Sequence, residues 1–280
     1  MKTLRYNTPL FATTTGLIGM ACVILLVFIA ITAPLLSTHD PNAIDVSSRL
    51  VGPSAAHWLG TDNLGRDLYS RLLYGARIAV GASLLVILMS LVCGLLLGVG
   101  AALVPGPVDQ IIMIVFDIIS SFPSLILALA LVAVLGPGLG NLILLISVVF
   151  IPHFGRVARA QALVVRNSLF LESEKVLGAG PLRLLFRHIL PNIISPIFVL
   201  ASMDIPVVIT IESGLSFLGV GVRPPLASWG NLLNDGYRLL DKAPWISIFA
   251  GLALILATLG FTLFGEALRD TLDPKASTDR

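Results

Sequence analysis

Three acidic side chains lie within long apolar runs of the sequence: Asp117, Asp204 and Glu212. A carboxylate at membrane depth costs free energy unless it faces protein or water, so such residues often carry a function. Asp204 and Glu212 lie roughly two helical turns apart and share one helix face. They could line a polar route for a solute, or they could form hydrogen bonds at an interface with another subunit. The pattern leaves both interpretations open. The same two interpretations apply to Asp117, which precedes Pro123.

No familiar catalytic motif accompanies these acids. The sequence has no Gly-x4-Gly-Lys-Ser/Thr phosphate loop, no His-Glu-x-x-His and no Gly-x-Ser-x-Gly. Neither Asp117 nor Asp204 stands in the Gly-x-Gly-Asp setting of an intramembrane protease. The two cysteines and four histidines show no metal-ligand spacing. We therefore expect a chain that is not an enzyme and that holds no cofactor or metal of its own.

The amino-acid composition indicates a membrane environment for the chain. Apolar residues make up 56% of the 280 residues and charged residues only 12%, whereas a soluble domain carries roughly 25% charged residues. Such a chain cannot cover a water-facing surface, so we expect a polytopic protein of the lipid bilayer. The net charge of +2 is too small to suggest nucleic-acid binding.

Six apolar runs predict an all-α protein with six transmembrane helices. The first run is too long for the apolar part of a signal peptide, although Lys2 and Arg5 precede it. It is long enough to span a hydrocarbon core of roughly 30 Å at about 1.5 Å per residue. The six runs cover residues 16–36, 78–104, 111–135, 139–153, 193–214 and 245–264.

Basic residues predict the orientation. Arg and Lys are enriched on the cytoplasmic side of membrane proteins, and the segment between the fourth and fifth runs holds six of them. We therefore place that segment, residues 154–192, in the cytoplasm. The remaining divisions follow: a cytoplasmic N-terminus (1–15), outer loops (37–77 and 217–244), a membrane core (78–265) and a cytoplasmic tail (266–280).

The cytoplasmic segment contains a short amphipathic pattern. Wound as a helix, residues 169–177 place Leu169, Phe170, Ser173, Val176 and Leu177 within one third of the circumference. Glu172, Glu174 and Lys175 fall outside this stripe, and Gly178 ends the helix. Such a helix could lie in the lipid interface, pack on the protein's own helices, or dock in a groove of a soluble partner. The pattern alone does not choose among these three.

Four ordered motifs carry a resemblance to a known family. Glu172-x5-Gly178, followed by Leu190-Pro191, resembles the EAA loop of ABC-importer permeases. Three further stretches resemble the C-type permease of dipeptide, oligopeptide and nickel importers. The first outer loop contributes Gly60, Asp62, Gly65, Arg66, Asp67 and Arg71; the last contributes Gly219, Gly221, Pro224 and Trp229; and the tail contributes Leu268 to Lys275.

The resemblance implies a mechanism and a set of partners. The loop helix would sit in a cleft of an ATPase subunit and transmit its movement to the membrane helices, using Leu169, Phe170, Glu172, Ser173, Glu174, Val176, Leu177 and Gly178. The partners would be a B-type permease, two ATPase subunits that bind ATP and Mg, and an extracytoplasmic substrate-binding protein. The location would be the bacterial cytoplasmic (inner) membrane. The substrates would be di- or oligopeptides, with nickel or metal chelates as the alternative.

Some residues depart from the family pattern or have a second interpretation. The family commonly has Glu-Ala-Ala where this chain has Glu172-Ser173-Glu174, and we expect Glu174 to face solvent or a basic residue of the ATPase. In the first outer loop we expect exposed ion pairs among Asp62, Arg66, Asp67 and Arg71 that shape the loop first and contact a substrate-binding protein second. We expect Trp229 to anchor in the membrane interface, with stacking on substrate as the alternative. The rival class is an ion-gradient transporter coupled through Asp117, Asp204 and Glu212, although no internal repeat supports it.

Overall fold

The structure, a computed structural model, describes residues 13–272, and helices dominate that range. The twelve preceding residues of the predicted cytoplasmic N-terminus and residues 273–280 of the predicted tail lie outside the described part. The helices are α1 (Thr14–Leu36), α2 (Leu68–Leu103), α3 (Pro107–Ser120), α4 (Ser124–Leu135), α5 (Leu139–Arg166), α6 (Leu169–Val176), α7 (Pro181–Leu184), α8 (Leu190–Phe217), α9 (Trp229–Tyr237) and α10 (Pro244–Leu272), with a 3-10 turn (Val46–Ser48) and a π-turn (Leu185–Ile189).

Five helical segments in the described part of the chain are long and apolar enough to cross a membrane: α1, α2, α5, α10 and the stretch Pro181–Phe217, which joins α7 to α8. Helices α3 and α4 supply a sixth span if the pair is taken as one. That pair is bent by 92°. The bend falls at Pro123, which lacks an N–H group and cannot continue the helical hydrogen bonds. The run at 111–135 is therefore not the straight span that its hydropathy suggests, whereas the all-helical fold is confirmed.

The helices extend beyond several of the apolar runs. Helix α2 begins at Leu68, within the predicted outer loop, because Asp67 caps its first turn by accepting a hydrogen bond from the Ser70 N–H. Helix α5 continues to Arg166, so the first part of the predicted cytoplasmic loop is the end of a long helix. Apolar runs mark the lipid-matched part of a helix and not its ends.

Close helix crossings rest on glycine. A side-chain carbon at Gly94 would lie 2.7 Å from Cβ of Phe154, and one at Gly98 would collide with the carbonyl oxygen of Gly155. These contacts fix the crossing of α2 and α5. A carbon at Gly260 of α10 would lie 2.7 Å from Cβ of Cys22 on α1. The small residues allow the backbones to approach closely, as is common between membrane helices.

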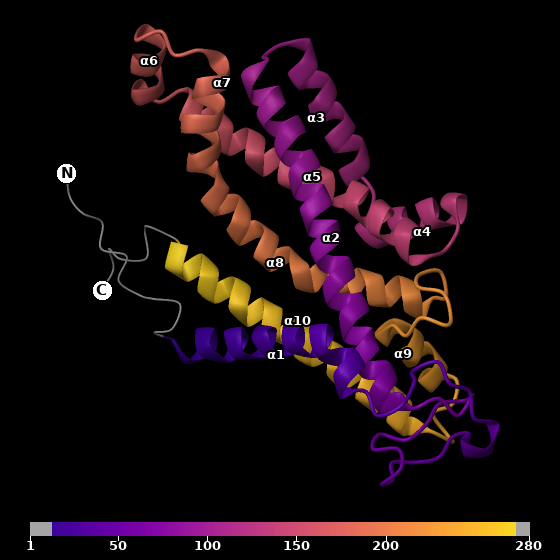
Figure 1. Cartoon of the computed structure of the whole chain (residues 1–280). Coiled ribbons are helices and arrows are strands. Elements are labelled where there is room, and N and C mark those ends of the chain that lie inside the picture. The colour runs from indigo at the N-terminus through magenta and orange to yellow at the C-terminus, as the bar shows by residue number, and fades with distance from the viewer. Residues whose placement is uncertain (1–12, 273–280) are drawn as a thin grey trace.

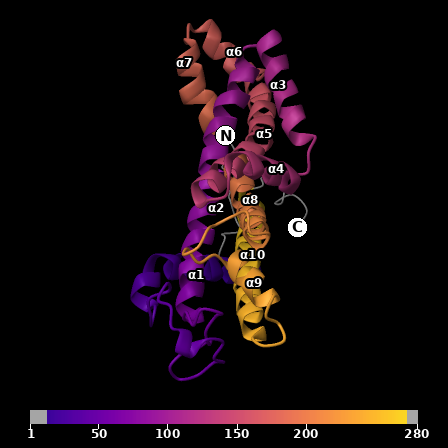
Figure 2. The ribbon, with the colours of Figure 1, turned by 90° about the vertical axis from the view of Figure 1, so that its right-hand side faces the viewer.

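The molecule is elongated, with two distinct ends (Figures 1 and 2). Helix α2 runs through most of its length, and α1 and α10 lie side by side. Helices α6 and α7 lie at one end, whereas α9 and the segment between α1 and α2 lie at the other. The predicted cytoplasmic and outer segments are thus separated by the length of the bundle.

Candidate functional site

The short helix α6 is attached to its own chain by one face only. Leu171 is 1% exposed, whereas Leu169 is 81%, Val176 88% and Leu177 81% exposed. Phe170 is about half exposed. The apolar stripe expected from the sequence therefore points away from the chain, and the interpretation that it packs on the protein's own helices is wrong.

Gly178 closes α6 with a conformation that favours glycine. Its φ is +83°, in the left-handed region. The N–H of Leu177 donates to the Ser173 carbonyl, and the N–H of Ala179 donates to the Glu174 carbonyl, so both bonds close the end of the helix. A side-chain carbon at Gly178 would meet nothing within 4 Å. The position thus requires glycine for its backbone angle and not for space.

Among the polar residues of α6, Glu174 faces its own loop. Glu172 is exposed, and the Ser173 hydroxyl donates to the Leu169 carbonyl at 3.0 Å. Glu174 is half-buried, and its Oε2 lies 3.7 Å from Nε2 of His188, whose ring meets Phe170 edge-on. In this structure Glu174 therefore faces a histidine of its own chain, which differs from the expected solvent or partner contact.

Three arginines of α5 bind α3 and α2 at the end of the molecule where α6 lies. Arg159 makes a two-pronged ion pair with Asp109 of α3, with both N–O distances 2.6 Å. Arg156 pairs with Asp117 at 3.0 Å, and Arg166 donates to the Ala102 carbonyl at 2.6 Å. Sequence reasoning used these arginines only for orientation. Their spacing along one helix face was the available signal.

The three acids of the apolar runs lie in three different settings. Asp117 is largely exposed and pairs with Arg156. Asp204 is buried on α8, and its Oδ2 lies 3.2 Å from Nε2 of the half-exposed His153 on α5. Glu212 is 1% exposed. The structure therefore does not gather them into one polar site.

Glu212 supports the turn that follows α8. Its carboxylate accepts hydrogen bonds from the hydroxyls of Ser216 (2.8 Å) and Ser213 (3.2 Å). The Ser216 hydroxyl oxygen in turn accepts from the Val222 N–H at 3.1 Å. Gly221 packs against Ser216 so closely that a side-chain carbon would overlap it. These contacts give Glu212 a local, structural environment.

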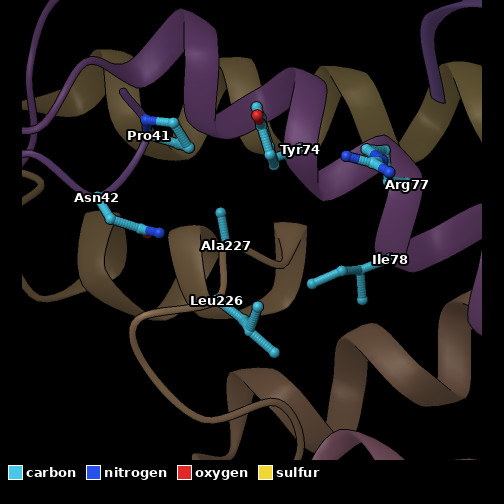
Figure 3. A pocket seen from close by; sticks show the side chains of 7 residues that line it. All are labelled: Pro41, Asn42, Tyr74, Arg77, Ile78, Leu226 and Ala227. Carbon is cyan, nitrogen blue, oxygen red and sulfur yellow. The ribbon is translucent and has the colours of Figure 1, made fainter. Parts of the chain in front are cut away.

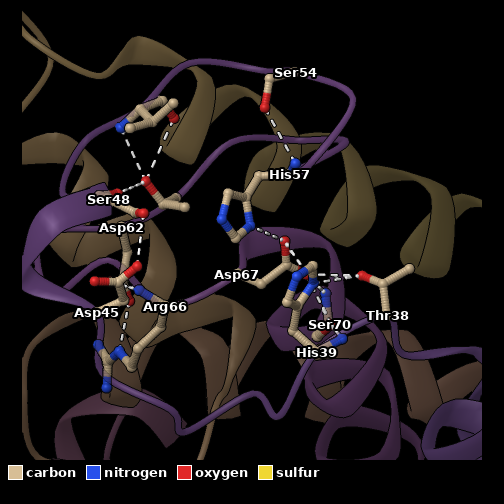
Figure 4. A network of polar contacts seen from close by, with 12 residues as sticks. Thr38, His39, Asp45, Ser48, Ser54, His57, Asp62, Arg66, Asp67 and Ser70 are labelled. Carbon is tan, nitrogen blue, oxygen red and sulfur yellow. Dashed lines mark hydrogen bonds and ion pairs between the residues drawn. The ribbon is translucent and has the colours of Figure 1, made fainter.

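The four charged motif residues of the first outer loop, Asp62, Arg66, Asp67 and Arg71, are buried, which corrects the expectation of exposed ion pairs. Figure 4 shows how Asp62, Arg66 and Asp67 lie in the loop. Arg66 Nε lies 2.7 Å from Asp62 Oδ2, and Arg71 Nε lies 3.4 Å from the same oxygen. Gly60 and Gly65 turn the backbone with φ of +83° and +76°. Removing one partner of such a buried pair would leave an uncompensated charge, so Asp62 and its two arginines depend on one another for this loop conformation.

Burial and hydrogen bonds set the pKa values of two acids at this end. Burial tends to raise the pKa of Asp67, but hydrogen bonds from the Ser70 N–H, His57 and the Ser70 hydroxyl outweigh it, so the pKa lies below its usual value. Burial raises the pKa of Asp235, and the charges of Arg66 and Arg71 only partly offset the effect.

The last outer segment is fixed to α2 by a tryptophan. Trp229 is 2% exposed, its indole N–H donates to the Leu72 carbonyl at 3.0 Å, and a side-chain carbon at Gly75 would lie 2.6 Å from its ring. The expected interfacial anchor is therefore wrong, because the ring is a buried packing element. Gly219 has a φ of +79° and Pro224 is exposed.

A cavity of about 230 Å³ opens where this segment meets α2 (Figure 3). Side chains from α2, from the chain after α1 and from the segment before α9 converge on it. The lining residues are Pro41, Asn42, Tyr74, Arg77, Ile78, Leu226 and Ala227. The cavity is lined by residues of both outer segments, and none of the three acids lines it.

Comparisons of the sequence with known protein families give two matches. Residues 92–278 match the family described as binding-protein-dependent transport system inner membrane component. Residues 10–53 match the N-terminal transmembrane domain of oligopeptide transport permease C.

Curated relatives are similar over nearly the whole chain. The probable D,D-dipeptide transport system permease protein DdpC of Escherichia coli (strain K12) is 44% identical over 91% of this chain and 85% of its own. The glutathione transport system permease protein GsiD of Pectobacterium atrosepticum is 42% identical over 90% and 84%. The nickel transport system permease protein NikC of Escherichia coli (strain K12) is 38% identical over 94% and 95%.

Proposed function

The chain belongs to the family of inner membrane components of binding-protein-dependent transport systems, and we propose that it moves di- or oligopeptides across the cytoplasmic membrane of a bacterium. As a permease of the peptide and nickel ABC importers, it is a multi-pass, non-catalytic subunit that works with a binding protein and with ATPases that bind ATP. The proposal adds three points: the substrate class, the subunit composition, and the residues that contact the ATPases or line the route of the solute.

The observation that carries the coupling proposal is the exposed apolar stripe of α6. Leu169, Val176 and Leu177 face away from the chain, while Leu171 fixes the helix to it. A short helix held in this way fits the groove of a soluble partner. When two ATPase subunits close, the helix would carry a rigid-body movement into α5 and α8.

Ion pairs between α5 and α3 support transmission of that movement. The pairs of Arg159 with Asp109 and of Arg156 with Asp117 join α5 to α3 near the loop. Movement of α6 would therefore shift both helices together. Termini in the cytoplasm and outer segments at 37–67 and 218–243 complete the proposed topology.

For the route, Asp204 is the strongest of the three acids. Its pairing with the half-exposed His153 leaves a polar pair between α5 and α8 that a passing peptide could contact. Asp117 and Glu212 make local contacts that account for them without a solute. A B-type permease would complete the route on the other side.

Peptides are the preferred substrate class because curated relatives named for D,D-dipeptide, dipeptide and glutathione transport are 44%, 39% and 42% identical. A nickel permease at 38% identity makes nickel, or a metal chelate, the second candidate. Selection of the solute then rests with the binding protein.

Purification of the tagged chain from its host membranes tests the proposal. We expect a second permease and two ATPase subunits to co-purify and to show vanadate-sensitive ATPase activity. In proteoliposomes with the binding protein, we expect uptake of a labelled dipeptide to require ATP. Uptake of Ni²⁺ but not of peptides would overturn the substrate class. Uptake driven by an ion gradient alone would overturn the importer mechanism.

A further inference from the structure

We propose that His39, His57 and Asp67 form a binding site for one divalent transition-metal cation, such as Zn²⁺, at the end of the molecule opposite α6. The three residues come from the chain just after α1, from the middle of the segment before α2, and from the N-cap of α2. Figure 4 shows both imidazole rings turned toward the same carboxylate.

The ligand atoms already have nearly the spacing that a cation needs. Nδ1 of His57 lies 2.9 Å and Nδ1 of His39 lies 3.7 Å from Oδ1 of Asp67. The three ligand atoms lie within 4.8 Å of one another. Ligands of tetrahedral zinc at bond lengths of about 2.0–2.1 Å stand roughly 3.4 Å apart. The two nitrogen–oxygen distances bracket this value. The two nitrogens stand up to 4.8 Å apart, so the rings must turn toward each other for all three atoms to reach one ion.

The carboxylate is held in place for this task. Asp67 is 2% exposed, and its Oδ2 accepts hydrogen bonds from the N–H and hydroxyl of Ser70 at 2.8 and 2.7 Å. Oδ1 is thereby left to the two imidazoles. Second contacts of this kind orient a metal ligand and strengthen its site.

Both rings present the same nitrogen, Nδ1, to one side of the Asp67 carboxylate, an arrangement that one cation could bridge. Nδ1 of His57 lies within hydrogen-bond distance of Oδ1, whereas Nδ1 of His39 lies 3.7 Å from Oδ1 and 3.0 Å from the Thr38 hydroxyl. The ring centroids of the two histidines are only 4.8 Å apart. One ion bound to both Nδ1 atoms and to Oδ1 would satisfy all three groups and leave one position for water.

The ligand types select the class of ion. Imidazole nitrogen suits zinc, nickel and copper, whereas magnesium and calcium prefer oxygen ligands. The bound ion would join the end of α1 to the start of α2. Its expected role is to hold the outer segment in one conformation, and the site lies apart from Asp204 and the proposed route.

Zinc binding to the purified complex, carrying a tag without histidine, tests the proposal. Equilibrium dialysis with metal analysis should give one Zn²⁺ per copy of this chain. His39→Gln and His57→Gln should each weaken binding by at least ~10-fold. His188→Gln is the matched control, since His188 also lies 3.7 Å from a carboxylate, that of Glu174, and we expect no change there.

Cobalt spectroscopy separates ligation from a folding effect. Co²⁺ at this site should give the visible bands of a four-coordinate nitrogen and oxygen site, and Zn²⁺ should displace it. Asp67→Asn keeps a residue that can cap α2, and we expect a folded complex with weaker Co²⁺ binding. Binding that is absent in the unchanged complex, or that survives both His39→Gln and His57→Gln, would overturn the proposal.

Discussion

Leu171 and Leu169 are two residues apart on α6 and face opposite ways, the first 1% exposed and the second 81% exposed. The buried leucine fixes the helix to the bundle. The exposed leucine begins an apolar stripe that the described part of the chain leaves uncovered. This difference between two identical side chains separates the residues that hold α6 from those available to a partner.

Substitutions at these two leucines should therefore have different effects. Leu171→Ala removes buried methyl groups and should lower the free energy of unfolding by about 2–5 kcal/mol. Leu169→Ser should change stability by no more than about 0.5 kcal/mol but lower ATP-driven uptake at least ~10-fold, as expected when an interface loses a central apolar contact. Thermal unfolding in detergent and uptake in proteoliposomes measure the two quantities.

Leu182 offers the matched control for Leu169. It is also apolar and exposed, at 69%, but it lies on α7, outside the stripe. Leu182→Ser should leave uptake within about two-fold of the unchanged protein, a difference that corresponds to ~0.4 kcal/mol. Equal losses of uptake in Leu169→Ser and Leu182→Ser would show that the stripe is not a specific contact.

The contact between Glu174 and His188 predicts a modest effect of charge. A half-buried pair 3.7 Å apart is worth about 0–1 kcal/mol, so Glu174→Gln should change uptake little. Glu174→Lys places a cation beside His188 and should weaken coupling. The measurement is uptake per ATP hydrolysed. If Glu174→Gln is as harmful as Glu174→Lys, the carboxylate has a direct role at the partner surface.

Asp204 and Glu212 should respond differently to loss of charge. Asp204→Asn weakens the pair with His153 and should reduce uptake per assembled complex. Glu212→Gln disturbs the hydrogen bonds from Ser213 and Ser216 and should reduce the yield of assembled complex instead. Uptake is normalised to the amount of complex in each preparation. Normal assembly with reduced uptake in Glu212→Gln would place that residue in the route.

The raised pKa of Asp235 predicts a pH-dependent stability. Burial favours its protonated form, so folding loses stability as pH rises from the unfolded value of about 3.9 through the folded pKa. Below that pH range Asp235 is protonated in both the folded and the unfolded state, so it does not change the free energy of unfolding. Asp235→Asn should remove this loss. Its midpoint of unfolding, relative to the unchanged protein, should therefore be higher at pH 7 than at pH 4, and an equal or opposite difference would contradict the assignment.

The sequence predicted the helical fold because apolar runs and helix-ending residues are local signals. It also predicted the stripe of α6, since the positions of Leu169, Val176 and Leu177 follow from helical geometry alone. The 92° bend at Pro123 is harder to predict from the sequence. Proline marks a possible break, but the angle depends on what the two halves pack against.

Contacts between distant segments were beyond the reach of the sequence. Trp229 is the residue type of an interfacial anchor, yet its ring is buried. The ring packs on α2 because Gly75 has no side chain and leaves space for it. The spacing of Arg156 and Arg159 along α5 indicates a basic face, but it does not show that Asp109 and Asp117 of α3 are its partners. Burial of Asp62 with Arg66 and Arg71 depends on the folded outer loop.

Photo-cross-linking from α6 tests the central claim most directly. A photoreactive residue at Leu169 should cross-link to an ATPase subunit in the purified complex, with a yield that changes when vanadate traps the ATPases. The same residue at Ile31 of α1, which is 71% exposed and lies near the end of α1 that leads into the outer segment opposite α6, should cross-link to lipid or to another membrane subunit. Cross-links from Leu169 to lipid alone, with an ATPase present in the complex, would contradict the account.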